Sequence, residues 1–128
     1  MQLEFTVPGR PVPKMRARVY VVKGKARGVT PTATREYEAK VWFVASANKL
    51  RTWPQDARYA VHVDAHIAPT KKPRAPRKMD LDNILKSVLD GLQGVLWNDD
   101  CQVDVVSARR WNDDNECVRV RVTCVEEK

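Results

Sequence analysis

The stretch that decides the fold runs from Asp80 to Asp104 and reads DLDNILKSVLDGLQGVLWNDDCQVD. At about 100° per residue its apolar side chains fall within one arc of roughly 140°, as a helix packed on a core requires. These residues are Ile84, Leu85, Val88, Leu89, Leu92, Val95 and Leu96. Asp82, Lys86 and Asp90 recur every four residues and stack along the opposite side. The pattern predicts an amphipathic helix that the chain leaves near Trp97.

Carboxylates flank this helix on both sides. Asp80 and Asp82 lie two residues apart in a segment expected to be extended, so that both side chains point the same way. Asp99 and Asp100 follow the helix in a turn. If that turn folds back towards the helix start, three or four carboxylates converge on one point. Such a cluster without nearby His or Cys suits Mg²⁺ or Mn²⁺ rather than zinc.

A magnesium site of this kind can activate a water for attack on phosphorus, and Lys86 could neutralise charge there or orient the water. Each residue also has a structural interpretation. Asp82 is a good N-cap, Lys86 and Asp90 could form an exposed ion pair, and Asn98-Asp99-Asp100 could be only a turn. The combination of D-x-D-N, a lysine four residues after the second Asp, and D-D-x-Q is more specific than any one of them.

At these residues the sequence resembles the RusA-type Holliday junction resolvases, which are small endodeoxyribonucleases of bacteria and their phages. The resemblance is carried by D-x-D-N at 80–83, by Lys86 and Asp90, and by W-N-D-D-C-Q-V at 97–103. It implies three catalytic carboxylates that bind magnesium and a lysine that is also needed. In this chain these are Asp80, Asp82, Asp100 and Lys86, with Asp99 as the reserve candidate for a metal ligand. The resemblance also implies a homodimer.

Length and composition favour one compact domain spanning residues 1–128. The chain has 128 residues, of which 43% are hydrophobic, and no apolar run approaches the length of a membrane span. Its N-terminus does not read as a signal peptide. The three cysteines are odd in number and form no C-x-x-C, which favours reduced thiols and a cytoplasmic protein, bacterial or phage-encoded by the resemblance.

Charge is segregated along the chain. Residues 1–78 hold 17 Lys/Arg and 5 Asp/Glu, a net of +12, whereas residues 79–128 hold 6 and 11, a net of −5. This favours a polyanion attracted by the first part and cut by a metal held in the second, over a basic protein with an acidic tail. The residues expected to bind DNA are Arg16, Arg18, Lys71, Lys72, Arg74, Arg77 and Lys78. Their alternative interpretation is a solvated hairpin and a solvated linker.

The remaining elements follow from periodicity. Strands are expected at 3–7, 19–22, 59–67, 103–111 and 117–125, with a flexible basic loop at 23–28 and a helix that Thr32 or Thr34 caps and that runs to about Leu50. On the strand at 59–67 the side chains of His62, Asp64 and His66 share a face, as metal ligands or as the polar side of an edge strand. The order β-β-α-β-α-β-β predicts an α+β fold, a mixed sheet with two packed helices.

Together these patterns predict a magnesium-dependent endonuclease that resolves four-way DNA junctions. Two other functions stay open at this point. One is a nuclease for flaps or RNA that uses the same metal site. The other is a non-catalytic, basic nucleic-acid-binding module whose carboxylates are only caps and turns.

Overall fold

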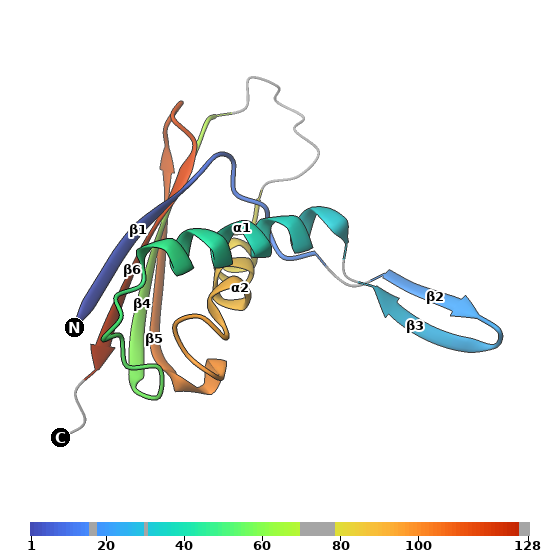
Figure 1. Cartoon of the computed structure of the whole chain (residues 1–128). Coiled ribbons are helices and arrows are strands. Elements are labelled where there is room, and N and C mark those ends of the chain that lie inside the picture. The colour runs from blue at the N-terminus through green and yellow to red at the C-terminus, as the bar shows by residue number, and fades with distance from the viewer. Residues whose placement is uncertain (16–17, 30, 70–78, 126–128) are drawn as a thin grey trace.

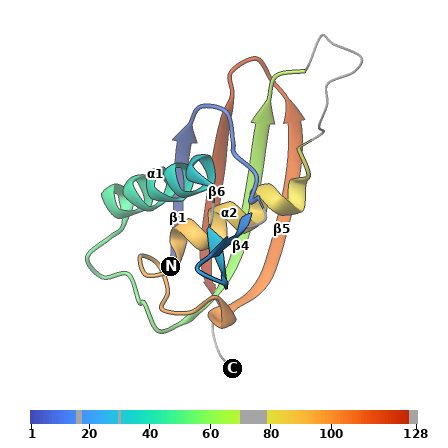
Figure 2. The ribbon, with the colours of Figure 1, turned by 90° about the vertical axis from the view of Figure 1, so that its right-hand side faces the viewer.

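A four-stranded mixed sheet with two helices on one of its faces forms the body of the chain (Figures 1 and 2). The computed structural model describes residues 1–15, 18–29, 31–69 and 79–125. Its main elements are β1 (Gln2–Pro8), α1 (Thr32–Asn48), β4 (Arg58–Ile67), α2 (Leu81–Leu92), β5 (Val103–Asn112) and β6 (Cys117–Val125). The α+β class, the mixed sheet and the two packed helices are therefore confirmed.

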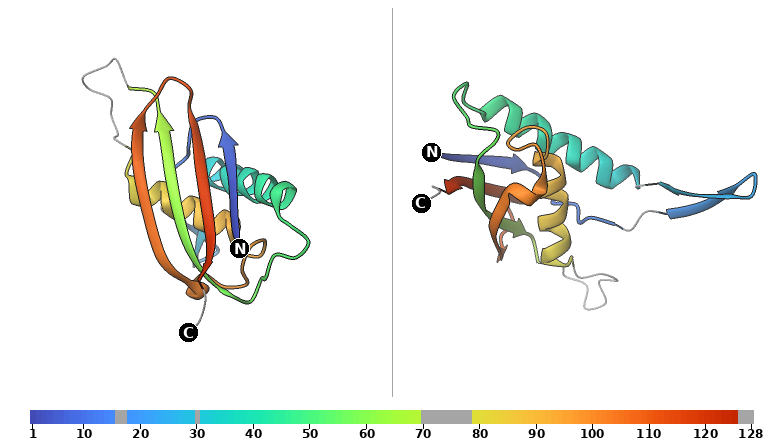
Figure 3. Two further views of the ribbon diagram at one scale, coloured as in Figure 1. Left: turned by 90° about the vertical axis from the view of Figure 1, so that its left-hand side faces the viewer. Right: turned by 90° about the horizontal axis from the view of Figure 1, so that it is seen from below.

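The strand order is β1-β6-β4-β5. The two pairs that involve β6 are antiparallel, whereas β4 and β5 are parallel and are joined through α2. Strict alternation gives β1 and β4 one buried and one open side, as Leu3, Phe5 and Val7 of β1 illustrate, whereas the edge strand β5 has no fully buried residue. The buried side faces α1 and α2, and the other side of the sheet carries no helix (Figure 3).

A second, two-stranded sheet projects from the body. It consists of β2 (Arg18–Val22) and β3 (Lys25–Val29), which extend away from the main sheet in Figure 1. Lys23 and Gly24 connect them with φ values of 51° and 76°, as a tight two-residue hairpin turn requires. The interpretation of 23–28 as a loop is thus wrong from Lys25 onwards, because the turn occupies only two residues.

Helix α1 packs on the body of the chain through one side. Tyr37, Val41 and Ala45 are buried, whereas Trp42 is 50% exposed. The predicted threonine cap is wrong, because Pro31 occupies the N-cap position and Thr34 is buried inside the helix. No helix among the described residues is long and apolar enough to cross a membrane.

Helix α2 is shifted relative to the prediction, since it begins at Leu81 and ends at Leu92. The apolar periodicity continues beyond Leu92 because Val95 and Leu96 also reach the core, but they do so from an irregular segment. That segment contains Gly94 at φ 88°, a conformation that ends a helix. The helix therefore carries Asp82 in its first turn rather than in an extended strand.

Candidate active site

The first two carboxylates stand at the beginning of α2. Asp80 occupies the N-cap position, where its backbone carbonyl accepts the N–H groups of Asn83 and Ile84 at 3.1 Å each. Its carboxylate caps no backbone N–H and accepts one long bond, 3.4 Å, from the Asn83 amide. The Asp82 side chain is 70% exposed. The interpretation of Asp82 as the N-cap is therefore wrong, and both carboxylates face solvent.

Lys86 lies one helical turn further along. Its Nζ is 3.8 Å from Oδ2 of Asp82, and its side chain is 61% exposed. At this separation the pair is a loose surface contact worth well under about 1 kcal/mol. Lys86 does not pair with Asp90, the partner that the structural interpretation gave it. The ammonium and the Asp82 carboxylate instead form one exposed patch.

Asp90 pairs with a residue that the sequence did not single out as part of the site. Nζ of Lys14 lies 2.9 Å from Asp90 and 2.7 Å from Glu38 on α1. The hydrogen bond to Glu38, helped by Asp90, raises the pKa of Lys14 against the opposing effect of burial. The backbone N–H of Lys14 also donates to the Asn83 carbonyl at 2.8 Å. Lys14 thus ties the segment before the β2–β3 hairpin to both helices.

The turn after α2 is held by two anchors. Trp97 is fully buried, with its ring 5.5 Å from that of Tyr59. The side-chain amide of Gln102 donates to the backbone carbonyls of Gln55 and Ala57 at 3.0 and 2.9 Å. Its oxygen accepts the backbone N–H of Asp99 at 3.0 Å, which completes a capping box. The Trp and the Gln of the W-N-D-D-x-Q pattern are therefore scaffold residues.

The two neighbouring carboxylates of this turn have different environments. Asp99 accepts the backbone N–H of Cys101 at 2.9 Å, and this bond holds the pKa of Asp99 below its ordinary value. Asp100 is partly buried and accepts the indole N–H of Trp97 at 2.8 Å. With its amide nitrogen turned inwards, Gln93 donates to both oxygens of Asp100 at 3.2 and 3.0 Å. Asp99 is a cap, whereas Asp100 is a positioned carboxylate.

Burial raises the pKa of Asp100, and the charges of Asp90 and Asp99 add to the rise. A raised pKa is expected of a carboxylate that lacks a cation beside it. The turn therefore brings Asp100 towards the second half of α2, near Gln93 and Asp90. It does not fold back towards the helix start.

The candidate carboxylates consequently stand at opposite ends of α2. Its 12 residues span about 18 Å, with Asp80 and Asp82 at the start and Asp99 and Asp100 beyond the end. In the part of the chain that the structure describes, no three His, Cys, Asp or Glu side chains form a group that could hold a metal ion. The expected convergence of three or four carboxylates is not found within one chain. The candidate metal ligands are all carboxylate oxygens, and they are spread along the helix rather than gathered in a closed cage.

The histidine face of β4 is a hydrogen-bonded network. His62 bonds to Ser107 at 2.6 Å and to Asp64 at 3.0 Å, and His66 bonds to Asp113 at 3.0 Å. Since β4 lies between β5 and β6, the interpretation as an edge strand is wrong. These residues form no metal-binding group among those described.

Most residues expected to bind DNA lie outside the described residues. These are Arg16, Lys71, Lys72, Arg74, Arg77 and Lys78. The backbone of Arg18 begins β2, at the base of the projecting hairpin. Two other basic residues of the N-terminal part are engaged by acids, since Arg10 pairs with Glu116 at 2.7 Å and Lys14 pairs with Glu38 and Asp90.

Comparison with known proteins agrees with the motif. The family described as Endodeoxyribonuclease RusA matches residues 8–123, a range that includes α2 and the turn that follows it. YqaN of Bacillus subtilis (strain 168), a protein described as uncharacterized, is 26% identical over 134 residues, with 94% of each chain covered. The chain therefore belongs to the RusA endodeoxyribonuclease family and is a hydrolase that acts on DNA.

Proposed function

We propose that this protein is a magnesium-dependent endonuclease that resolves four-way DNA junctions by paired cleavage of phosphodiester bonds during recombination and repair. The observation that carries the proposal is the family match over residues 8–123. Because the matched family consists of endonucleases, it favours a catalytic role for the exposed carboxylates of α2 and of the turn that follows it. A non-catalytic binding module no longer fits a chain that belongs to an endonuclease family.

Asp80 and Asp82 would hold the metal ion. Magnesium keeps several waters and takes one or two carboxylates together with substrate phosphate, so an exposed pair suits it better than a closed cage does. When bound, the ion supplies an activated water and stabilises charge on the leaving oxygen. The oxygen-only donor set and the exposure of both carboxylates support this assignment.

Lys86 would assist the metal site formed by Asp80 and Asp82. Asp100 stands beyond the other end of α2, about 18 Å away along the helix, so within one chain it would not share that ion and would serve as a separate carboxylate of the reaction. The bonds from Trp97 and Gln93 hold the Asp100 carboxylate in one orientation, which a metal ligand or a base for water requires. This supports Asp100 over Asp99, whose oxygen is engaged as a cap. Lys86 stands beside Asp82 with its ammonium in solvent, where it can approach a phosphate and stabilise charge in the transition state.

Paired cleavage would need two copies of the chain. A four-way junction has two strands to cut at symmetric positions, and a two-fold dimer presents an identical site to each. The expected assembly is a dimer of about 29 kDa, twice the 14.6 kDa of the chain. Light scattering of the free protein and of its junction complex measures it. A monomer that still makes paired cuts would contradict the symmetric mechanism.

The proposed DNA-binding residues would supply affinity without sequence preference. Lys71, Lys72, Arg74, Arg77 and Lys78 lie just before Asp80 in the sequence, and Arg16 lies two residues before Arg18, the first residue of β2. Neutralising two of the five residues before Asp80 should flatten the dependence of log binding constant on log salt by up to about 2. An unchanged slope would assign these charges to solvent.

The experiment that tests the function is a cleavage panel with four-way junction, flap, linear duplex and RNA substrates. Each substrate is incubated with magnesium, with manganese and with EDTA. The proposal expects cuts in the four-way junction that require the divalent ion, with little cutting of linear duplex. Preferential cutting of flaps or RNA would show that the substrate is not the four-way junction, although the proposed metal site would stand. Cutting in EDTA would exclude the metal mechanism.

A further inference from the structure

The open face of the sheet, the side that no helix covers, carries two arginines on β6. Arg119 and Arg121 alternate with buried valines along β6 and are exposed on the side away from the helices. Across the β4–β6 pair, Arg119 is opposite Asp64 and Arg121 is opposite His62. The left view of Figure 3 shows this face of the sheet in front of the helices.

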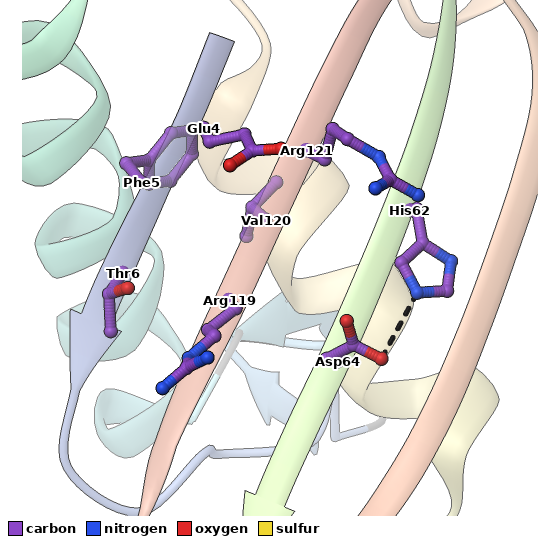
Figure 4. A pocket seen from close by; sticks show the side chains of 8 residues that line it. All are labelled: Glu4, Phe5, Thr6, His62, Asp64, Arg119, Val120 and Arg121. Carbon is purple, nitrogen blue, oxygen red and sulfur yellow. Dashed lines mark hydrogen bonds and ion pairs between the residues drawn. The ribbon is translucent and has the colours of Figure 1, made fainter.

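These two arginines border a hollow in the middle of the face. The hollow has a volume of about 440 Å³ and lies over β1, β6 and β4. In Figure 4 Arg119 and Arg121 extend from β6, while His62 and Asp64 rise from β4 on the neighbouring side. The hollow is open to solvent and shallow, so a ligand would lie across it rather than enter a closed cavity.

The carboxylates of Glu4 and Asp64 also line the hollow, but they are not paired with the two guanidinium groups. Neither guanidinium group forms an ion pair with a carboxylate in the ranges that the structure describes. Glu4 is opposite Arg121 in the β1–β6 register, but its carboxylate accepts a bond from Gln2 at 2.8 Å. Arg119 helps to lower the pKa of Asp113, whose main bond is to the Asn115 N–H, without contacting it. Two cations therefore remain available to an external anion.

The two acids that line the hollow, Glu4 and Asp64, are already engaged in hydrogen bonds. Asp64 accepts the indole N–H of Trp111 at 2.9 Å and bonds to Nε2 of His62 at 3.0 Å. Burial would raise the pKa of Asp64, but these two bonds outweigh it and hold the pKa below its ordinary value. Asp64 is thus a structural anion that links β4 to β5.

A third arginine is held on the same face. The guanidinium carbon of Arg109 lies 3.6 Å from the centroid of the Trp111 ring, and the ring of His66 stacks with Trp111 at 6.0 Å and 8°. Because Arg109 and His66 both pack against the Trp111 ring, that ring is not free to stack on a base. It instead fixes the position of Arg109, which favours contacts with phosphates over readout of bases.

We propose that this open face, with Arg119 and Arg121 as its main ligands, binds the phosphodiester backbone of a DNA duplex. The planar guanidinium group pairs with phosphate through two parallel hydrogen bonds, which suits an exposed arginine pair on a rigid strand. The inference rests on the proposed DNA substrate and adds a second contact surface to it. Since α2 lies behind the sheet, one chain would contact DNA both at its candidate active site and on the opposite face.

The test compares two double variants that remove the same charge. Arg119→Gln/Arg121→Gln alters the open face, and Arg35→Gln/Arg51→Gln removes two exposed arginines from α1 and the loop that follows it. Binding to a four-way junction and to linear duplex is measured by fluorescence anisotropy in EDTA from 50 to 300 mM salt, at about equal steps of log salt. The slope should fall by about 1.8 for the face variant, since each phosphate contact on B-DNA contributes roughly 0.9, and by less than about 0.5 for the control.

A second measurement locates the contact. The side-chain Nε–H signals of Arg119 and Arg121 in nitrogen-15 spectra, assigned from single variants, should shift when duplex is added, while that of Arg35 should not. The inference would be overturned if the salt-dependence slopes of Arg119→Gln/Arg121→Gln and the wild type were equal and the arginine Nε–H signals did not shift. The proposed function would still stand in that case if the wild type bound and cut the junction. A change in oligomeric state in place of the slope change would assign the face to a second copy of the chain, and an absence of DNA binding by the wild type would overturn both.

Discussion

Gly91 stands where α2 crosses α1, and replacing it with alanine tests whether this crossing is as close as the structure shows. A Cβ atom at position 91 would lie 2.8 Å from Cβ of Val41 and 2.9 Å from the carbonyl oxygen of Glu38. Carbon atoms in contact normally stay about 3.5–4.0 Å apart, so the new methyl group would overlap by roughly 1 Å. Neither of these two atoms is the end of a flexible side chain, so the helices would have to separate.

The expected free energy change follows from two opposing effects. Overpacking a core costs about 1–3 kcal/mol, while alanine gains up to about 1 kcal/mol over glycine inside a helix. We expect Gly91→Ala to lower the free energy of unfolding by about 1–2 kcal/mol and the melting temperature by about 4–8 °C. Thermal and urea unfolding followed by circular dichroism measure both.

Lys86→Ala is the matched control for that experiment, since Lys86 is exposed on the same helix and should change the melting temperature little. A variant Gly91→Ala that melts higher than the wild type would refute the close crossing. The position of α2 on the sheet, and with it the separation of the carboxylates at its two ends, would then need revision.

Three further predictions concern the candidate site. Asp80→Asn, Asp82→Asn and Asp100→Asn should each abolish cleavage of a labelled junction on denaturing gels while leaving binding in gel shifts intact or tighter, and full activity in any one would remove that residue from the site. Lys86→Ala should lower the single-turnover rate by at least about tenfold with little change in affinity, whereas a proportional loss of binding would make Lys86 a phosphate anchor. Because the pKa of Asp100 is raised above 3.8, its ionisation opposes folding once the pH rises through the folded pKa. Asp100→Asn should therefore resist urea better than the wild type at pH 7 in EDTA, with the advantage lost near pH 3, and an equal advantage at both pH values would contradict the linkage.

Local pattern was sufficient to predict much of the fold. The alternation of Tyr59, Val61 and Val63 identifies β4 and its buried face, because a strand has a strict period of two. The periodicity of α2 likewise identifies Ile84, Val88 and Leu92 as core. The helix end was misplaced because a buried irregular segment can continue an apolar period that belongs to a helix.

Tertiary placement was beyond the reach of the sequence. The D-x-D-N and W-N-D-D-x-Q patterns marked the candidate residues, but no local rule tells which end of α2 the following turn approaches. That depends on Trp97 and Gln102, which anchor the turn to Tyr59 and to the segment before β4. The ion pair of Lys14 with Asp90 joins residues far apart in the chain, and it could not be inferred from spacing either.

The most direct test of the central claim uses a supercoiled plasmid that extrudes a cruciform, since paired cuts across the four-way junction give a linear product and single cuts give a nicked circle. With magnesium, the wild type should convert the plasmid to the linear form before nicked circles accumulate, with 5′ and 3′ ends mapping symmetrically about the junction. Mixed dimers of wild type and Asp82→Asn should give nicked circles, and EDTA should leave the plasmid intact. Equal cutting of a plasmid without the cruciform, or linear product from Asp80→Asn/Asp82→Asn protein, would contradict the account.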